Sequence, residues 1–105
     1  MAQTSGGLLA GKVAFITGAS RRIGRATALG LARAGADLLL NARSARDEVE
    51  GVAAEVRALG RSATVVMGDV TDESAVKGMV DAAKAACGRI DILVNNAAIR
   101  RQSPF

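Results

Sequence analysis

The chain has 105 residues, half of them apolar, so it can form one domain with an aliphatic core and no more than one. Its formal net charge is only +4 and it holds two aromatic residues, which argues against nucleic-acid binding, because single strands are recognised by stacking on aromatic side chains. A single cysteine excludes an internal disulfide, and with no histidine beside it the usual zinc sites are excluded as well. A chain without disulfides favours a cytoplasmic location. No apolar run reaches the length of a membrane span.

The first predicted element is a buried strand that leads into a glycine-containing turn and a helix. The apolar run Val13–Ile16 is followed by the sequence TGASRRIGR at residues 17–25. The first amides of a helix lack partners within the helix and carry partial positive charge, so this turn can bind a pyrophosphate. Gly18 allows the tight turn, and Gly24 lets the helix pack close to the strand.

One position of this turn departs from the usual dinucleotide-binding pattern. A further glycine is expected two residues before Gly24, where the backbone approaches the cofactor, and Arg22 stands there instead. Arg22 can supply a cation for a phosphate, or it can be a solvated residue at the start of the helix. We expect Arg21, Arg25 and Arg43 to lie around the same turn and to add to its positive charge.

The second predicted strand, Asp37–Ala42, ends without an acidic residue. NAD sites commonly place Asp or Glu there to accept hydrogen bonds from the ribose 2′-hydroxyl, and such an acid would repel a 2′-phosphate. Asp37 lies at the opposite edge of the sheet, whereas Arg43 follows the strand and can pair with a 2′-phosphate. With Arg21, this favours NADP(H) over NAD(H); the alternative is that Arg43 is an exposed loop residue.

Two further helices are predicted from apolar residues at helical spacing. Ser44 and Thr71 precede acidic residues, and each can cap the helix that follows it. The helices present apolar stripes, the second with Val49, Val52, Ala53, Val56 and Leu59, and the third with Val76, Met79, Val80, Ala83 and Cys87. A glycine follows each of the three helices, where a left-handed residue is needed to end it: Gly35, Gly60 and Gly88. Cys87 is expected to be a core thiol, since no histidine is present to activate it.

The remaining strands are the β-branched segment Ala63–Met67 and the apolar segment Ile90–Val94. Four apolar strands separated by helices predict right-handed crossovers and a parallel sheet covered on both faces. The predicted fold class is therefore α/β: an incomplete, three-layer, doubly wound Rossmann fold with three helices and four strands in the order 3-2-1-4. The ligand is expected at the carboxyl ends of the strands, near the first strand.

Two short motifs follow the third and fourth strands. After the third, Asp69 could accept a hydrogen bond from an adenine amino group with Val70 beside the ring, or it could be an ordinary acid before a helix. After the fourth, the sequence NNAA at residues 95–98 is small enough for its backbone to run close to a ligand or to the first strand. The alternative for this second motif is a polar turn.

Together, the motifs T-G-x-x-x-x-x-G (residues 17–24), G-D-V (68–70) and N-N-A-A (95–98) resemble the classical short-chain dehydrogenase/reductase family from about Lys12 onward. The sequence differs from the family pattern at Arg22, as pteridine-reductase-type members do, and at Ala98. The resemblance implies an oxidoreductase that transfers a hydride between a nicotinamide and a carbonyl or alcohol. It also implies the cofactor-binding positions: Thr17, Gly18, Ser20, Arg21, Arg22, Ile23 and Gly24 at the pyrophosphate turn, Arg43 and Ser44 at the 2′-phosphate, Asp69 and Val70 at the adenine, and Asn95 and Ala97 at the neighbouring ribose.

The family's catalytic Ser and Tyr-x-x-x-Lys elements follow the N-N-A-G motif, and this chain contains no tyrosine. We therefore expect residues 1–10 to be a flexible tail and residues 11–105 to be an NADP-binding half-domain, truncated after the fourth strand and inactive by itself. The complete enzyme would be a homo-oligomer acting on a small carbonyl or alcohol compound. A non-catalytic module that senses NADP(H) and a fragment completed by another chain are the alternatives. An unpaired fourth strand predicts marginal stability or self-association.

Overall fold

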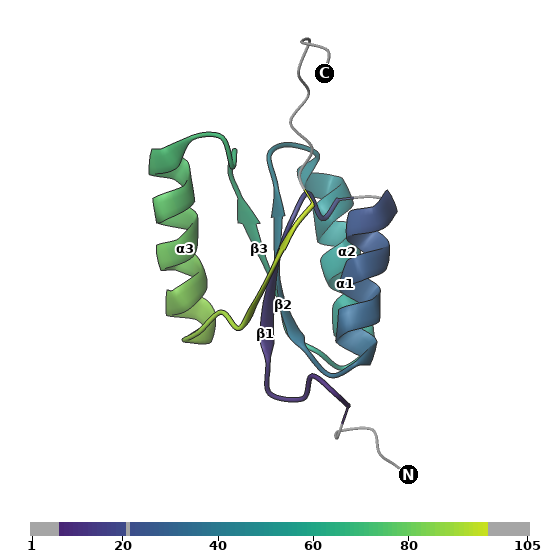
Figure 1. Ribbon diagram of the computed structural model, residues 1–105. Coiled ribbons are helices and arrows are strands. Elements are labelled where there is room, and N and C mark those ends of the chain that lie inside the picture. The colour runs from purple at the N-terminus through teal and green to yellow at the C-terminus, as the bar shows by residue number, and fades with distance from the viewer. Residues whose placement is uncertain (1–6, 21, 97–105) are drawn as a thin grey trace, which may run out of the picture.

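The computed structural model describes residues 7–20 and 22–96, where strands and helices alternate along the chain. The strands are β1 (Val13–Thr17), β2 (Asp37–Ala42), β3 (Ala63–Met67) and β4 (Ile92–Asn95), and the helices are α1 (Arg22–Arg33), α2 (Arg46–Ala58) and α3 (Glu73–Cys87). The strands pair in parallel in the order β3-β2-β1-β4. Figure 1 shows α1 and α2 over one face of the sheet and α3 over the other. The predicted three-layer α/β fold and its strand order are confirmed.

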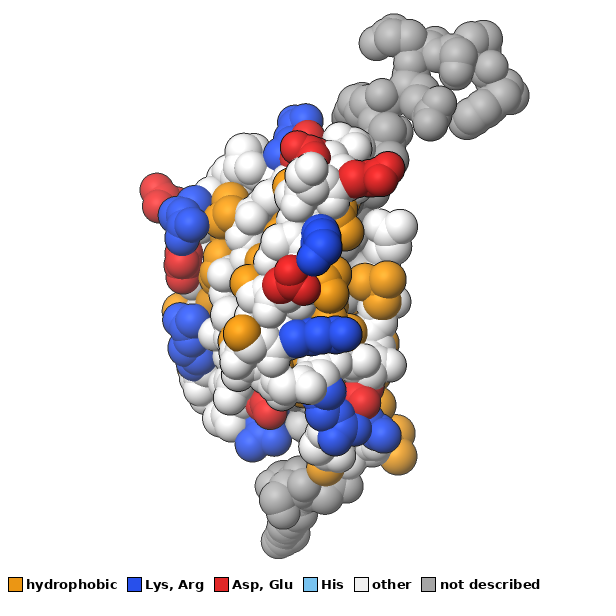
Figure 2. All heavy atoms as spheres, turned by 90° about the vertical axis from the view of Figure 1, so that its left-hand side faces the viewer, with side chains coloured by type: hydrophobic (Ala, Val, Ile, Leu, Met, Phe, Trp, Pro, Cys, Tyr) orange, Lys and Arg blue, Asp and Glu red, His pale blue; other side chains and the backbone are white. Residues whose placement is uncertain are grey.

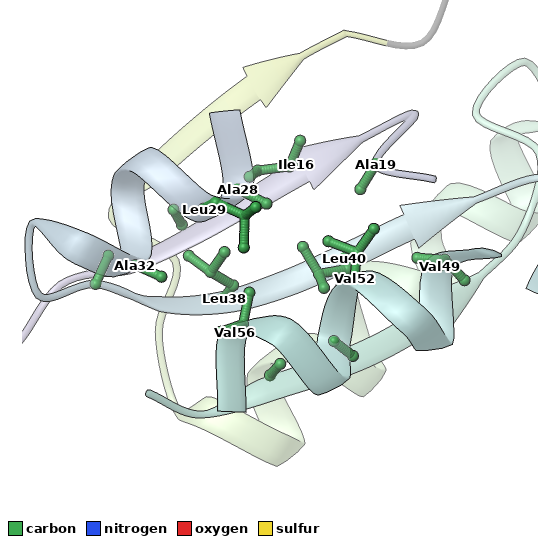
Figure 3. Close-up of a cluster of buried hydrophobic side chains, with 14 of the residues drawn as sticks. Ile16, Ala19, Ala28, Leu29, Ala32, Leu38, Leu40, Val49, Val52 and Val56 are labelled. Carbon is green, nitrogen blue, oxygen red and sulfur yellow. The ribbon is translucent and has the colours of Figure 1, made fainter. Parts of the chain in front are cut away.

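The larger hydrophobic core lies between the sheet and helices α1 and α2 (Figure 3). Leu38 and Leu40 of β2 point into this layer, whereas Leu39 packs on the α3 side, because side chains alternate along a strand. The two helices contribute small and branched side chains: Ala28, Leu29, Ala32, Val49, Val52, Ala53 and Val56. The predicted stripe of α2 is confirmed except at Leu59, which caps the end of the helix and is 43% exposed.

The layer under α3 is thinner. Of the stripe predicted for this helix, Met79 and Ala83 are buried, while the rest is half-buried: Val76, Val80 and Cys87. The two buried residues pack against Phe15, Leu39 and Val66 of the sheet. Cys87 packs at the margin of the same cluster, as expected of a core thiol.

An apolar groove of about 280 Å³ remains open between α3 and β4. Phe15, Val80, Ile90 and Leu93 line it, and Leu93 is 68% exposed. Figure 2, viewed from the α3 side, shows apolar side chains emerging beside the charged outer face of this helix. Within the described ranges β4 pairs on one side only, with β1. The predicted open edge at the fourth strand is therefore present in this part of the chain.

The helix ends agree with the predictions, and the helix starts do not. Gly35, Gly60 and Gly88 all have positive φ, as predicted for residues that end helices. The predicted cap Ser44 is wrong, because Ala45 precedes α2 in a left-handed conformation and no side chain caps that helix. The predicted cap Thr71 is also wrong, for a physical reason: its N–H and hydroxyl both bond the carboxylate of Asp69.

The start of α3 is capped by the next residue. The Asp72 carboxylate accepts hydrogen bonds from the N–H groups of Ser74 (2.9 Å) and Ala75 (3.3 Å). An acid at this position satisfies orphan helical donors and interacts favourably with the helix dipole. The sequence pattern identified the start of this helix but assigned its cap one residue too early.

Asp91 fixes the beginning of β4 to the beginning of β1. The strand itself starts at Ile92, two residues later than predicted. The Asp91 carboxylate accepts a hydrogen bond from the N–H of Val13 (2.8 Å), and the Asp91 N–H donates to the Val13 carbonyl (2.8 Å). The Arg89 guanidinium pairs with the same carboxylate at 2.7 Å. Chiefly because of the Arg89 hydrogen bonds, and then the Val13 bond, the pKa of Asp91 lies below its ordinary value.

Residues 7–12 form a turn before β1. The Leu9 N–H donates to the Ala34 carbonyl at 2.8 Å, and the Leu9 side chain packs against the larger core. Residues 1–6, the greater part of the expected N-terminal tail, lie outside the described residues. In the described parts of the chain no helix has the length and hydropathy needed to cross a membrane.

Candidate cofactor-binding site

The turn from β1 into α1 lies at the carboxyl end of the sheet, as predicted (Figure 1). Gly18 has a φ of 63°, the left-handed conformation in which glycine is favoured. The Ala19 N–H donates to the Asn41 carbonyl at 2.8 Å, which holds the turn against the end of β2. Ser20 is half-buried beside it, and Ile23 is 70% exposed at the first turn of the helix.

Gly24 is the point of closest approach between α1 and this turn. A Cβ at this position would lie 2.1 Å from the Gly18 carbonyl oxygen and 2.9 Å from the Asn96 side-chain nitrogen. Both distances are shorter than a Cβ tolerates, so only glycine fits. The predicted reason for this glycine, close packing of the helix on the strand, is confirmed. This packing leaves the first amides of α1 at the carboxyl end of the sheet.

Arg22 has a φ of 53°, so it is left-handed although it is not glycine. This is the position where the dinucleotide-binding pattern expects a further glycine, and the backbone explains that preference directly. In a left-handed residue the Cβ crowds the following carbonyl oxygen, at a cost of about 1–2 kcal/mol. The side chain of Arg22 is exposed. Arg21, the neighbouring predicted contact, lies outside the described residues.

Arg25 does not join the phosphate turn as expected. Its guanidinium pairs instead with the Glu55 carboxylate of α2, with 2.8 Å between Nε and Oε1. The hydrogen bond to Arg25 holds the pKa of Glu55 below its ordinary value. The α1 side chain at this position therefore links the two helices on their exposed surface and is directed away from the predicted ligand.

The end of β4 is attached to the phosphate turn through a threonine. The Thr17 hydroxyl donates to the side-chain oxygen of Asn95 (3.1 Å) and accepts from the Asn96 N–H (2.9 Å). The Asn96 side chain donates to the Gly18 carbonyl at 3.2 Å. The structure thus brings Thr17, Gly18 and Asn95 together as predicted, and adds Asn96 as their link. Ala97, the last predicted contact, lies outside the described residues.

The residues after β2 and β3 form the other half of the candidate site. Arg43 and Ser44 are exposed directly after β2, and Asp69 and Val70 are half-buried after β3. The Asp69 Oδ1 accepts from the Thr71 N–H (2.9 Å) and hydroxyl (2.7 Å). These bonds, together with the nearby charge of Arg43, hold the pKa of Asp69 below its ordinary value. Asp69 therefore presents an ionised carboxylate close to Arg43.

Asn41, a buried residue near the carboxyl end of β2, was not predicted as a site residue. Asn41, only 1% exposed, donates its side-chain amide hydrogens to the carbonyls of Val66 and Gly68. Its signal in the sequence is a polar residue within the otherwise apolar strand Asp37–Ala42. No group of three or more potential metal ligands occurs in the part of the chain that the structure describes.

Comparisons with known proteins agree with this geometry. The short chain dehydrogenase family matches residues 12–105. The chain is 48% identical to a short-chain dehydrogenase/reductase, FrzI, from Cladobotryum, over 82% of this chain and 33% of that protein. It is 45% identical to the gluconate 5-dehydrogenase of Gluconobacter oxydans, over 92% of this chain and 38% of the enzyme.

Among solved structures, the carveol dehydrogenase of Mycobacterium avium in complex with NAD superimposes with a TM-score of 0.84. The two are 36% identical, and the match covers 89% of this chain and 38% of the other. This chain thus spans between 33% and 38% of the length of these relatives. On the strength of the family match and these identities, the chain belongs to the short-chain dehydrogenase/reductase family.

Proposed function

We propose that the carboxyl ends of β1 to β4 bind a nicotinamide dinucleotide, with its pyrophosphate at the start of α1. The observation that carries the proposal is the packing at Gly24, where a Cβ would collide with the Gly18 carbonyl at 2.1 Å. That packing places the unpaired first amides of α1 at the end of a buried strand, with exposed Arg22 beside them. A doubly charged pyrophosphate fits this donor set.

The remaining proposed contacts with the cofactor lie along the carboxyl ends of the strands. Asp69 and Val70 would hold the adenine: the Asp69 Oδ2 accepts no hydrogen bond from the described residues and can accept one from the amino group. Val70 lines the apolar groove together with Thr17 and Asn95, so a flat ring can lie against this end of it. Ser20, Ile23 and Gly24 would line the pyrophosphate, and Asn95 the neighbouring ribose. We propose the same roles for Arg21 and Ala97, by resemblance to the family.

NADP(H) is favoured over NAD(H) because of the residues that follow β2. Arg43 and Ser44 are exposed there, and no acid stands at the end of that strand. The guanidinium can form charge-assisted hydrogen bonds with a 2′-phosphate. Asp69 is ionised nearby, but its carboxylate bonds to Thr71 and forms no ion pair with Arg43 among the described residues, so the guanidinium can still pair with a phosphate. The NAD in the carveol dehydrogenase structure is a property of that relative. The preference for NADP(H) proposed for this chain rests on Arg43.

Titration of the chain with NADPH and NADH tests this preference. We expect NADPH to bind at least tenfold more tightly, a difference of about 1.4 kcal/mol, and the Arg43→Ala variant to lose the difference. The control is Arg33→Ala, which removes the same charge from the last turn of α1, at the far end of the sheet. Tighter binding of NADH, or equal loss in both variants, would contradict the assignment of Arg43.

The complete protein is proposed to be an oxidoreductase that acts on a small carbonyl or alcohol compound. The bound nicotinamide would supply or accept the hydride. This chain has neither tyrosine nor histidine, so we expect its 105 residues to bind the cofactor without turnover. The single half-buried thiol suits a reducing compartment, which supports a cytoplasmic location, and we retain the homo-oligomer as the proposed state of the complete enzyme.

A further inference from the structure

Asn41 is a polar residue inside the α3 layer of the core. It is 1% exposed and lies in β2, and its side chain reaches the sulfur of Met79 at 3.1 Å. A buried amide is unfavourable unless its hydrogen-bonding groups have partners. A branched apolar residue would suit the core of this strand better, so the partners of Asn41 are informative.

Its two carbonyl partners lie near the end of β3 and in the turn that follows this strand. The Asn41 side-chain nitrogen donates to the carbonyl oxygens of Val66 (3.0 Å) and Gly68 (3.1 Å). The N–H of Gly68 donates in turn to the carbonyl of Ala42, the next residue of β2, at 3.0 Å. Both backbone polar groups of Gly68 are thus held by β2. The chain direction at Asp69, the next residue, is fixed by these bonds.

The backbone of Asn41 faces the other half of the site. Its carbonyl accepts the Ala19 N–H at 2.8 Å, within the turn proposed to bind pyrophosphate. One residue therefore contacts the phosphate turn through its main chain and the adenine turn through its side chain. The two contacts can be separated by mutation, because a substitution changes only the second.

We propose that Asn41 is a positioning residue for the adenine end of the cofactor. It acts through Gly68, sets the distance between Asp69–Val70 and the phosphate turn, and does not itself touch the ligand. The inference rests on the proposed function, since it takes the adenine to lie at Asp69 and Val70. α3 supports the same arrangement: a Cβ on Gly68 would lie 2.5 Å from the Met79 sulfur, so the turn packs tightly against that side chain.

The test measures two ligands on the 105-residue chain and on Asn41→Leu. Leucine has the same branched side-chain skeleton as asparagine, although it is larger, and it has no donor for the two carbonyls. Adenosine 2′,5′-bisphosphate reports the adenine end, and inorganic pyrophosphate reports the phosphate turn. We expect the variant to bind the bisphosphate about tenfold more weakly, while its affinity for pyrophosphate changes less than about twofold. Hydrogen exchange at the amides of Gly68 to Val70 should become faster.

Two further variants separate positioning from stability. Asn41→Ser retains one donor, so its affinity for the bisphosphate should also fall, but by less than that of Asn41→Leu. If Asn41→Leu does not fold, Asn41→Ser provides the test. Val56→Ala removes volume from the other core, so it should lower the melting temperature without changing the ratio of the two affinities. A selective loss in the Asn41 variants alone supports the proposal.

The failures are distinguishable. If the parent chain binds both ligands and the Asn41 variants lose neither or lose both equally, the positioning role is wrong and the proposed function stands. If the parent chain does not bind the bisphosphate at all, the proposed adenine site is wrong, and the role of Asn41 is wrong with it.

Discussion

Replacing Arg22 with glycine should make this chain more stable. Arg22 has a φ of 53°, so its Cβ is held in the left-handed region at a cost of about 1–2 kcal/mol. Glycine removes that cost but adds conformational freedom to the unfolded chain, which offsets about 0.4–1 kcal/mol. The net gain in the free energy of unfolding is then between about 0 and 1.6 kcal/mol, with a central value of about 0.8 kcal/mol. For a chain of this length, the central value raises the melting temperature by about 3–6 °C.

Thermal and urea unfolding followed by circular dichroism measure this gain. Two matched variants accompany it. Arg22→Ala removes the charge but keeps the Cβ, so its stability should stay within about 0.5 kcal/mol of the parent. Ala45→Gly removes a Cβ from the other left-handed non-glycine residue, with a φ of 58°, and should give a similar gain. If Ala45→Gly stabilises the chain and Arg22→Gly does not, the assignment of strain to Arg22 is refuted.

Two predictions concern β4. The pKa of Asp91 is lowered on folding, so its contribution to stability is fully present above the unfolded pKa of about 3.9 and is lost as the pH falls through the lower folded value. Asp91→Asn should therefore reduce the fall in the free energy of unfolding that urea titrations measure between pH 7 and pH 3. If this free energy falls as steeply in the variant as in the parent chain, the prediction is wrong. The apolar groove should make the chain self-associate. Leu93→Lys should reduce the association measured by sedimentation velocity, because Leu93 is exposed and a lysine protects an exposed strand edge. A parent chain that is monomeric at every concentration would disprove the predicted self-association.

The framework of this fold is readable in the sequence because it depends on local patterns. The bounds of β2 and β3 agree with their predictions, since each is a short apolar run between a helix and a polar turn. The order of the strands follows from the handedness of the crossovers. Gly35, Gly60 and Gly88 end helices as predicted because a left-handed backbone restricts the residue type strongly.

The errors arise where several residue types satisfy the same need or where the partner is distant. Asp72 caps α3 in place of Thr71, because acids and hydroxyls are both good caps and Asp69 captures the threonine. Arg25 was expected at the phosphate turn, but its partner Glu55 lies 30 residues further along, on another helix. The role of Asn41 likewise depends on Gly68, 27 residues later, and no local pattern reports such a contact.

The bond between Val13 and Asp91 joins residues that are 78 positions apart. On a ribosome that adds about 5–20 residues per second, β1 therefore waits about 4–16 s for the neighbour that completes its second side. Throughout that interval a central strand of the future sheet has a free edge, and Phe15 lacks the cover that β4 helps to provide. Nascent-chain chaperones accordingly have a defined window in which to protect this protein, and slower synthesis of β4 would prolong it.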